Sequence, residues 1–209
     1  MRSITLKLIY SALLLACLAS CGQQTNDGAA GQSAAPVAGS FNSIDLTGAP
    51  YAQGFSLPDY DGKLRDLKEF KGKVVVVFFG FTHCPDVCPT TMAEIKEVKR
   101  LLGAQGDKLQ GIFITLDPER DTAAMLKPYV QTFDPSFLGL IGTPEQTAQL
   151  AKDFRIYYKK VAGSSAQDYS LDHTAASFVY DTQGRLRLYT RYNSGAEKLA
   201  ADIQKLLAE

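Results

Sequence analysis

An uninterrupted run of valine and phenylalanine, followed closely by two cysteines, constrains the fold of this chain more than any other feature. Residues 74–79 read Val-Val-Val-Val-Phe-Phe, which is typical of a strand buried on both faces. Gly80 allows the chain to leave the strand, and Pro89 suits the first turn of a helix, where its missing N–H costs nothing. Cys84 and Cys88 therefore lie at a strand-to-helix turn near the positive end of a helix, which favours the thiolate form. The sequence thus predicts a redox or metal-binding dithiol at this turn.

The other hydrophobic patterns predict strands that alternate with helices. A hairpin is expected over residues 55–64, around the Asp61-Gly62 turn. An antiparallel pair of strands and an amphipathic helix close the chain. This order predicts an α/β domain over residues 45–209, with a mixed sheet flanked by helices on both faces and an N-terminal β-hairpin. The expected strands are 74–79, 109–116, 138–142, 155–161, 176–180 and 185–190, and the expected helices are 90–102, 123–133, 144–154 and 195–207.

The first 44 residues are expected to precede the folded domain. Residues 1–20 combine a basic start, a short apolar stretch and small residues at the end, as a secretory signal peptide does. The sequence Leu-Ala-Ser-Cys-Gly at 18–22 resembles a bacterial lipobox, which makes Cys21 the lipidated first residue of the mature protein. A plain secretory signal and an uncleaved membrane anchor are the alternatives. Residues 21–44 are rich in Gly, Ala, Gln and Ser and are expected to form a flexible tether that holds the domain off the membrane on its periplasmic side.

Charge and cysteine usage narrow the possible functions. The 22 basic residues balance the 22 acidic ones, so nothing in the charge indicates nucleic-acid binding. Of the four cysteines, Cys17 lies in the apolar part of the expected signal and Cys21 carries the lipid in this interpretation. Cys84 and Cys88 remain for chemistry, in a compartment where dithiols tend to oxidise.

Two thiolates and one imidazole form a donor set for a soft metal ion. Such donors suit Cu(I) and can also hold Cu(II) or Zn(II). The chain has two histidines. His83 directly precedes Cys84, and adjacent residues of an extended chain point to opposite sides, so we expect His83 beside the site rather than in it. His173 is equally consistent with a ligand and with a structural histidine. A structural disulfide between Cys84 and Cys88 is the alternative for the dithiol, although so short a loop stabilises a fold less than a longer one.

Two aspartates near these residues have both functional and structural interpretations. Asp86 lies between the cysteines, where it either tunes metal affinity or faces a partner, or simply occupies a turn. Asp172 either orients His173 and balances its charge, or is a solvated turn residue.

The segment 117–122, Asp-Pro-Glu-Arg-Asp-Thr, follows the end of a predicted strand, where α/β domains place functional sites. We interpret Asp121 as the cap of the next helix and Arg120 as the partner of an acidic residue, and the role of Asp117 stays open. A group of tyrosines further along is interpreted as half-buried strand residues rather than a docking face. These are Tyr157, Tyr158 and Tyr169.

Three segments of the chain resemble the signature of the Sco/SenC family. They are residues 79–89 with both cysteines, residues 117–122, and residues 171–174, which read Leu-Asp-His-Thr. The resemblance implies a thioredoxin-like fold and a membrane-tethered protein that binds copper, Cu(I) or Cu(II), through Cys84, Cys88 and His173. It also implies a role in cytochrome c oxidase assembly, with the dinuclear copper centre of subunit II as the target. Other periplasmic copper carriers and thiol-disulfide oxidoreductases are further expected partners.

Two functions are compatible with these residues. A copper metallochaperone would pass its ion to an acceptor by ligand exchange, because three ligands leave a position open. A thiol-disulfide oxidoreductase would attack with Cys84 and resolve with Cys88. The C-x-x-x-C spacing differs from the C-x-x-C of thioredoxins, and the turn at 172–174 lacks the proline that thioredoxins place opposite their dithiol. A peroxidase of related fold has only the dithiol in its favour. The metallochaperone is the expected function, and enzymatic activity stays undecided.

Overall fold

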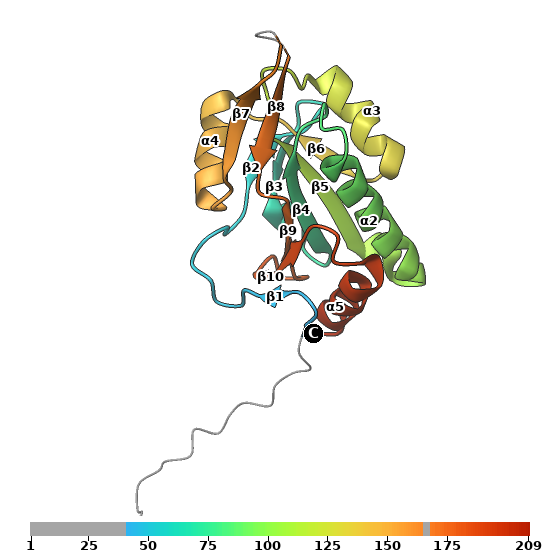
Figure 1. Cartoon of the computed structure of the whole chain (residues 1–209). Helices are drawn as coiled ribbons and strands as arrows, with labels where there is room; N and C mark the ends of the chain where they lie inside the picture. The colour runs from blue at the N-terminus through green and yellow to red at the C-terminus, as the bar shows by residue number, and fades with distance from the viewer. Residues whose placement is uncertain (1–40, 165–167) are drawn as a thin grey trace, which may run out of the picture. The chain divides into compact units, whose positions relative to one another are not determined.

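A six-stranded mixed sheet forms the centre of the domain (Figure 1). The structure, a computed structural model, describes residues 41–164 and 168–209. In spatial order the strands of the sheet are β1 (Ile44–Asp45), β10 (Leu186–Arg191), β9 (Ala176–Tyr180), β4 (Val74–Gly80), β5 (Leu109–Thr115) and β6 (Leu138–Leu140). Strands β4, β5 and β6 are parallel, whereas β9 pairs antiparallel with both β4 and β10, and β1 pairs antiparallel with β10. The predicted mixed sheet is confirmed.

Helices cover both faces of this sheet, as predicted. They are α2 (Val87–Leu101), α3 (Ala123–Phe133), α4 (Pro144–Asp153) and α5 (Ala196–Ala208). Figure 1 shows α2, α3 and α5 on one side of the sheet and α4 on the other. Every residue of β4 is buried, because neighbouring residues of the strand face opposite layers. Phe79 packs against Phe154 at the end of α4, with ring centroids 4.8 Å apart, whereas the adjacent Gly80 faces Cys88 in α2.

The predicted N-terminal hairpin consists of β2 (Ser56–Pro58) and β3 (Leu64–Asp66), paired antiparallel. Gly62 has a φ of +79°, a conformation that favours glycine in the turn between them. The carboxylate of Asp59 accepts hydrogen bonds from the backbone N–H groups of Asp61 (2.9 Å) and Lys63 (3.0 Å) and so fixes this turn. The short 3₁₀ helices η1 (Leu67–Phe70) and η2 (Gly103–Lys108) precede β4 and β5 respectively.

A second hairpin lies outside the central sheet. It pairs β7 (Tyr158–Ala162) with β8 (Tyr169–His173), and Tyr158 is opposite His173. We expected a strand from residue 155, but Arg155 has a φ of +57°, so β7 begins three residues later. We did not predict β8, since its five residues include a single fully buried one, Leu171, and form no continuous apolar run.

The folded part of the chain includes residues that we assigned to the tether. The backbone N–H groups of Asn42 and Ser43 donate to the buried carboxylate of Asp202 in α5, at 2.9 and 2.8 Å. Residues 41–44 are therefore held against the domain, while the expected signal peptide, Cys21 and the rest of the tether lie outside the described residues. In the part of the chain that the structure describes, no helix is both long and apolar enough to span a membrane.

Candidate metal centre

Gly80 gives the thiol of Cys88 its space. A Cβ atom on Gly80 would lie 2.8 Å from Cys88 Sγ and 2.9 Å from the ring of Phe113, both too close for a real contact. Gly80 is the last residue of β4 and pairs with Thr115, and the chain leaves the strand directly after it, as expected. Glycine is required here because a buried sulfur packs directly on the backbone.

The sulfur of Cys84 occupies the place of a helix cap. Helix α2 begins at Val87, so Pro89 lies in its first turn as predicted, and Cys88 lies in that turn as well. The carboxylate of the N-cap residue, Asp86, accepts no capping hydrogen bond from the backbone of the helix, whereas the backbone N–H of Cys88 donates to Cys84 Sγ at 3.4 Å. The N-terminal end of a helix carries a partial positive charge, which stabilises a thiolate at this position.

His173, at the end of β8, supplies the third donor. Its Nε2 lies 3.7 Å from Cys88 Sγ, and its Nδ1 lies 3.1 Å from the carbonyl oxygen of Thr174. A carbonyl only accepts hydrogen bonds, so in the neutral imidazole Nδ1 carries the proton and Nε2 presents a lone pair to the sulfurs. The edges of two aromatic rings enclose the imidazole: the centroids of Phe78 and Phe81 lie 6.1 and 6.0 Å from its own.

The three donor atoms are arranged to hold one ion. Cys84 Sγ, Cys88 Sγ and His173 Nε2 all lie within 4.8 Å of one another. If an ion lies in the plane of three such donors, about 2.3 Å from each sulfur and about 2.0 Å from the nitrogen, the donors are roughly 3.7–4.0 Å apart. The distance from Cys88 to His173 is already close to this value, and Cys84 is only partly buried, so its side chain has room to adjust. The donor set is that of a soft ion such as Cu(I).

The two thiols differ in acidity. The hydrogen bond from Cys88 lowers the pKa of the Cys84 thiol to about 4, with smaller contributions from the backbone N–H groups of Cys88 and Asp86. The same hydrogen bond and burial raise the pKa of the Cys88 thiol above its ordinary value. In the metal-free dithiol, Cys84 is therefore the thiolate, and Cys88 holds the shared proton.

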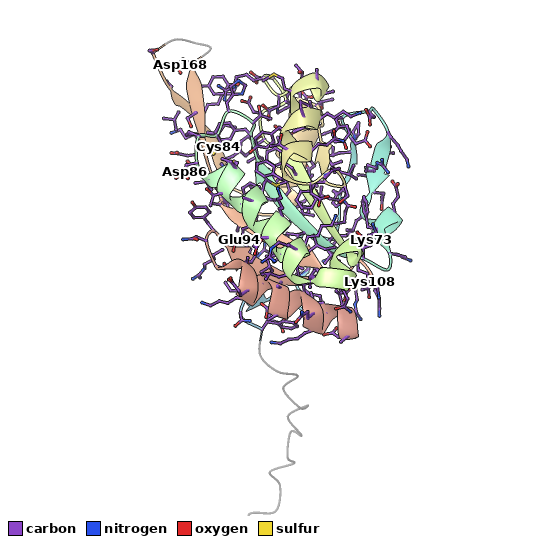
Figure 2. All side chains as sticks on the ribbon, turned by 90° about the vertical axis from the view of Figure 1, so that its right-hand side faces the viewer. Lys73, Cys84, Asp86, Glu94, Lys108 and Asp168 are labelled. Atoms are coloured by element: carbon purple, nitrogen blue, oxygen red, sulfur yellow. The ribbon has the colours of Figure 1, made fainter. Side chains whose placement is uncertain are left out.

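The other residues predicted near the site lie around it. His83 is exposed and is outside the three-residue cluster, in agreement with our expectation. Asp86 is exposed, and its carboxylate accepts a hydrogen bond from the Thr90 hydroxyl at 3.3 Å. Asp172 is also exposed, on the opposite face of β8 from His173, so the Thr174 carbonyl rather than Asp172 orients the imidazole. Figure 2 shows Cys84 and Asp86 together at the start of α2.

The interpretation of Asp121 as a helix cap is wrong. The N-cap of α3 is Thr122, and the buried carboxylate of Asp121 accepts hydrogen bonds from the backbone N–H of Thr82 (3.0 Å) and the hydroxyls of Thr82 (2.6 Å) and Thr115 (2.6 Å). Asp121 therefore fixes the loop that leads to Cys84. This role could not be predicted from the sequence, because Thr82 lies 39 residues away from Asp121 and nothing in their spacing pairs them.

The predictions for Arg120 and for the group of tyrosines are confirmed in part. Arg120 pairs with an acid as predicted, since its Nε lies 2.5 Å from the Asp117 carboxylate. The buried Asp117 also accepts a hydrogen bond from the Tyr169 hydroxyl at 2.6 Å. Tyr169 is partly buried as expected, and so is Tyr158, whereas Tyr157 is 61% exposed and the half-buried interpretation of it is wrong.

The fold and the site define a thioredoxin-like domain with a Cys-Cys-His donor set at a strand-to-helix turn. The model of the SCO1/SenC family matches residues 44–208, and the chain belongs to this family.

Curated relatives support the assignment. The chain is 39% identical to the mitochondrial SCO2 homolog of Bos taurus over 166 residues, 78% of this chain and 62% of the relative. It is 34% identical to the SCO2-like protein of Rickettsia felis over 151 residues, 72% of this chain and 73% of the relative. The chain thus spans less than two thirds of the length of the mammalian SCO2 proteins that it matches.

Solved structures have the same fold. The structure of Bradyrhizobium japonicum ScoI with copper bound is 44% identical, with a TM-score of 0.66, and the match covers 73% of this chain and 96% of ScoI. Yeast Sco1 with copper bound is 32% identical, also with a TM-score of 0.66, and the match covers 73% of this chain and 85% of Sco1.

Proposed function

We propose that this protein is a copper metallochaperone that holds one copper ion between Cys84, Cys88 and His173. The observation that carries the proposal is the convergence of two sulfurs and an imidazole nitrogen within 4.8 Å of one another. Membership of the SCO1/SenC family supports copper as the ion, because bacterial ScoI and yeast Sco1 have been solved with copper bound. By the family resemblance, the acceptor is the dinuclear copper centre of cytochrome c oxidase subunit II.

The burial of the three donors suggests how the ion is released. Cys84 and His173 are partly exposed, whereas Cys88 is completely buried. Three ligands leave a position open on the ion, and an acceptor thiolate binds there from the exposed side. His173 and Cys84 are then the first donors to be replaced, and Cys88 is the last. The copper leaves with acceptor ligands in place of the original donors, and no net redox change is needed.

The unequal acidity of the two thiols favours a second candidate function. As a thiol-disulfide oxidoreductase, the Cys84 thiolate would attack a disulfide of the target and form a mixed disulfide. The Cys88 thiol would then lose its proton and attack Cys84, releasing the target as two thiols and leaving a Cys84–Cys88 disulfide. We rank this function second, because Cys88 is buried and its raised pKa slows the resolving step.

We also propose that the domain is attached to the outer side of a bacterial membrane by a lipid on Cys21. The lipobox-like sequence at 18–22 supports this attachment. In that compartment the dithiol needs a reductant, so thiol-disulfide oxidoreductases are expected partners besides the oxidase subunit. Other periplasmic copper carriers are expected partners because the site must receive its copper ion.

Copper stoichiometry tests the proposed function. The protein used is the chain from residue 22 onward, which retains every described residue. This protein is reduced, loaded anaerobically with Cu(I) and then desalted in the presence of a weak competing ligand. We expect about one copper per chain, with both thiols protected from alkylation. A chain that retains no copper and has both thiols freely alkylated would contradict the metallochaperone and favour the oxidoreductase.

A further inference from the structure

The ligands of the candidate metal centre come from two separate parts of the fold. Cys84 lies between β4 and α2, and Cys88 lies in the first turn of α2, so both follow directly from a strand of the central sheet. His173 lies on the β7–β8 hairpin, which shares no strand pairing with that sheet among the described residues. Residues 174 and 175 join His173 to β9, which pairs with β4, so the sheet holds the C-terminal end of β8. Other contacts must hold the rest of the hairpin and set its orientation over the cysteines.

Tyr169, the first residue of β8, makes several polar contacts with the segment 117–120. Its hydroxyl donates to Asp117 at 2.6 Å, and its carbonyl accepts a hydrogen bond from Arg120 Nη1 at 2.7 Å. The Arg120 guanidinium also lies over the Tyr169 ring, with its central carbon 3.5 Å from the ring centroid. Asp117 and Arg120 are joined at 2.5 Å, and Asp117 is 1% exposed. Partly buried, charge-assisted bonds of this kind hold a fixed geometry.

The same segment contacts the part of the fold that carries the cysteines. Asp121 accepts the hydrogen bonds of Thr82, two residues before Cys84. The Arg120 guanidinium lies 5.9 Å from the centroid of Phe81, whose ring meets the imidazole of His173 at 83° with centroids 6.0 Å apart. Residues 117–121 are therefore bonded both to the hairpin with His173 and to the loop with Cys84.

Strand geometry transmits the position of Tyr169 to His173. Alternate residues of a strand face the same side, and Tyr169, Leu171 and His173 are the residues of β8 that are at least partly buried against the domain. The strand rises about 3.3 Å per residue, so Tyr169 and His173 are roughly 13 Å apart on one face. Leu171, between them, is packed in the core. Contacts that fix Tyr169 therefore also fix the position of His173.

We propose that Asp117, Arg120 and Tyr169 are positioning residues, which dock the β7–β8 hairpin on the domain and so place His173 Nε2 beside the two sulfurs. This role deepens the proposed function and rests on it, since it concerns the third ligand of the copper site. Loss of a residue that orients a metal ligand typically weakens metal binding about 10- to 100-fold, and the same is expected here.

Two variants and one control test the proposal on the reduced chain from residue 22 onward. Tyr169→Phe removes only the hydroxyl that bonds Asp117 and keeps the ring on Arg120. Arg120→Lys keeps the charge but loses the planar group that bonds Asp117 and the Tyr169 carbonyl together. Tyr157→Phe is the matched control, because it removes a hydroxyl from an exposed tyrosine next to the same hairpin.

The first measurement needs no metal. Amide hydrogen exchange of residues 169–174 and the ¹⁵N signals of the His173 ring are compared between the variants and the wild type. We expect faster exchange at 169–174 and loss of the single Nδ1–H tautomer in Tyr169→Phe and Arg120→Lys, with β4 and β5 unchanged. Unchanged exchange and ring signals, or an equal loss of protection throughout β4 and β5, would overturn the positioning role.

The second measurement uses Cu(I). In competition with a chromophoric chelator, we expect the two variants to bind about 10- to 100-fold more weakly, and X-ray absorption to show both sulfurs retained with less nitrogen. Tyr157→Phe should match the wild type, and wild-type affinity in all three variants would overturn the proposal. If the wild type itself binds no copper, the proposed function fails. The positioning role is then decided by the measurements without metal, which are amide exchange at 169–174 and the ¹⁵N signals of the His173 ring.

Discussion

The thiol of Cys88 lies 3.7 Å from Nε2 of His173, although 85 positions separate the two residues in the chain. Each belongs to a part of the fold with its own local constraints. Gly80 and the first turn of α2 place Cys88, and a backbone carbonyl fixes the tautomer of His173. The site is therefore assembled by tertiary contacts from two locally determined pieces.

Replacement of His173 separates the two candidate functions. We expect His173→Ala to weaken Cu(I) binding by more than the roughly 10- to 100-fold that loss of an orienting partner costs, because a ligand itself is lost. The rate at which the dithiol reduces a model disulfide should change little, since both sulfurs remain. The measurement is competitive Cu(I) titration beside disulfide reduction. His83→Ala is the matched control, because His83 is exposed and outside the cluster, and it should retain wild-type affinity. Equal copper affinity of His173→Ala and the wild type would remove His173 from the ligand set.

The acidity of Cys84 predicts an unusual pH dependence of alkylation. The pKa of Cys84 is about 4 in the folded protein, far below the ordinary thiol value of about 8.5. The thiolate is thus formed at every pH above about 4, and the stability that it contributes is lost as the pH falls through that value. The rate of alkylation of the metal-free, reduced protein by iodoacetamide should change less than about two-fold between pH 5.5 and 8, whereas an ordinary thiol gains more than about 100-fold.

The variant Cys88→Ala serves as the comparison for this measurement. It removes the largest cause of the lowered pKa, so the alkylation rate of Cys84 should then rise with pH over a higher range. A wild-type rate that rises with a midpoint near the ordinary thiol pKa would show that the hydrogen bond from Cys88 does not hold Cys84 as a thiolate.

The space at Gly80 predicts a substitution that damages both stability and metal binding. In Gly80→Ala the new methyl group would overlap Cys88 Sγ, so the sulfur must move. Overpacking of this kind costs about 1–3 kcal/mol in the free energy of unfolding. Gly111→Ala is the matched control, since a Cβ atom there would lie 2.8 Å from the ring of Phe137 instead of a ligand. Both variants should unfold at lower denaturant concentration, but only Gly80→Ala should lose copper affinity. Full copper affinity in Gly80→Ala would mean that the position of Cys88 does not depend on this glycine.

The attachment at Cys21 is tested by fractionation. We expect Cys21→Ser to move the protein from the membrane fraction to the soluble extracytoplasmic fraction, because serine cannot accept the thioether-linked lipid. Cys17, in the apolar part of the expected signal, supplies the control. The Cys17→Ser protein should remain in the membrane fraction. A Cys21→Ser protein that remains in the membrane fraction would favour the uncleaved anchor.

Features that depend on neighbouring residues were predictable from the sequence alone. The buried strand at 74–79, the dithiol turn and the helix after it follow from contiguous patterns, because burial on both faces and the first turn of a helix are local requirements. The mixed sheet with helices on both faces and the N-terminal hairpin followed in the same way. Cys84 and Cys88 were therefore identified as a pair from their spacing.

Features that depend on residues distant in the chain were decided by the tertiary structure. The sequence patterns left two interpretations of His173 open, and β8 was not predicted because this strand has no apolar run of its own. Its first residue, Tyr169, instead contacts Asp117 and Arg120, which lie 52 and 49 positions earlier in the chain. The role of Asp121 was misassigned for the same reason, as its hydrogen-bond partner Thr82 is 39 residues away. Local periodicity reports which side of an element is buried, but only the folded chain determines which distant polar groups meet there and therefore which donors can share one ion.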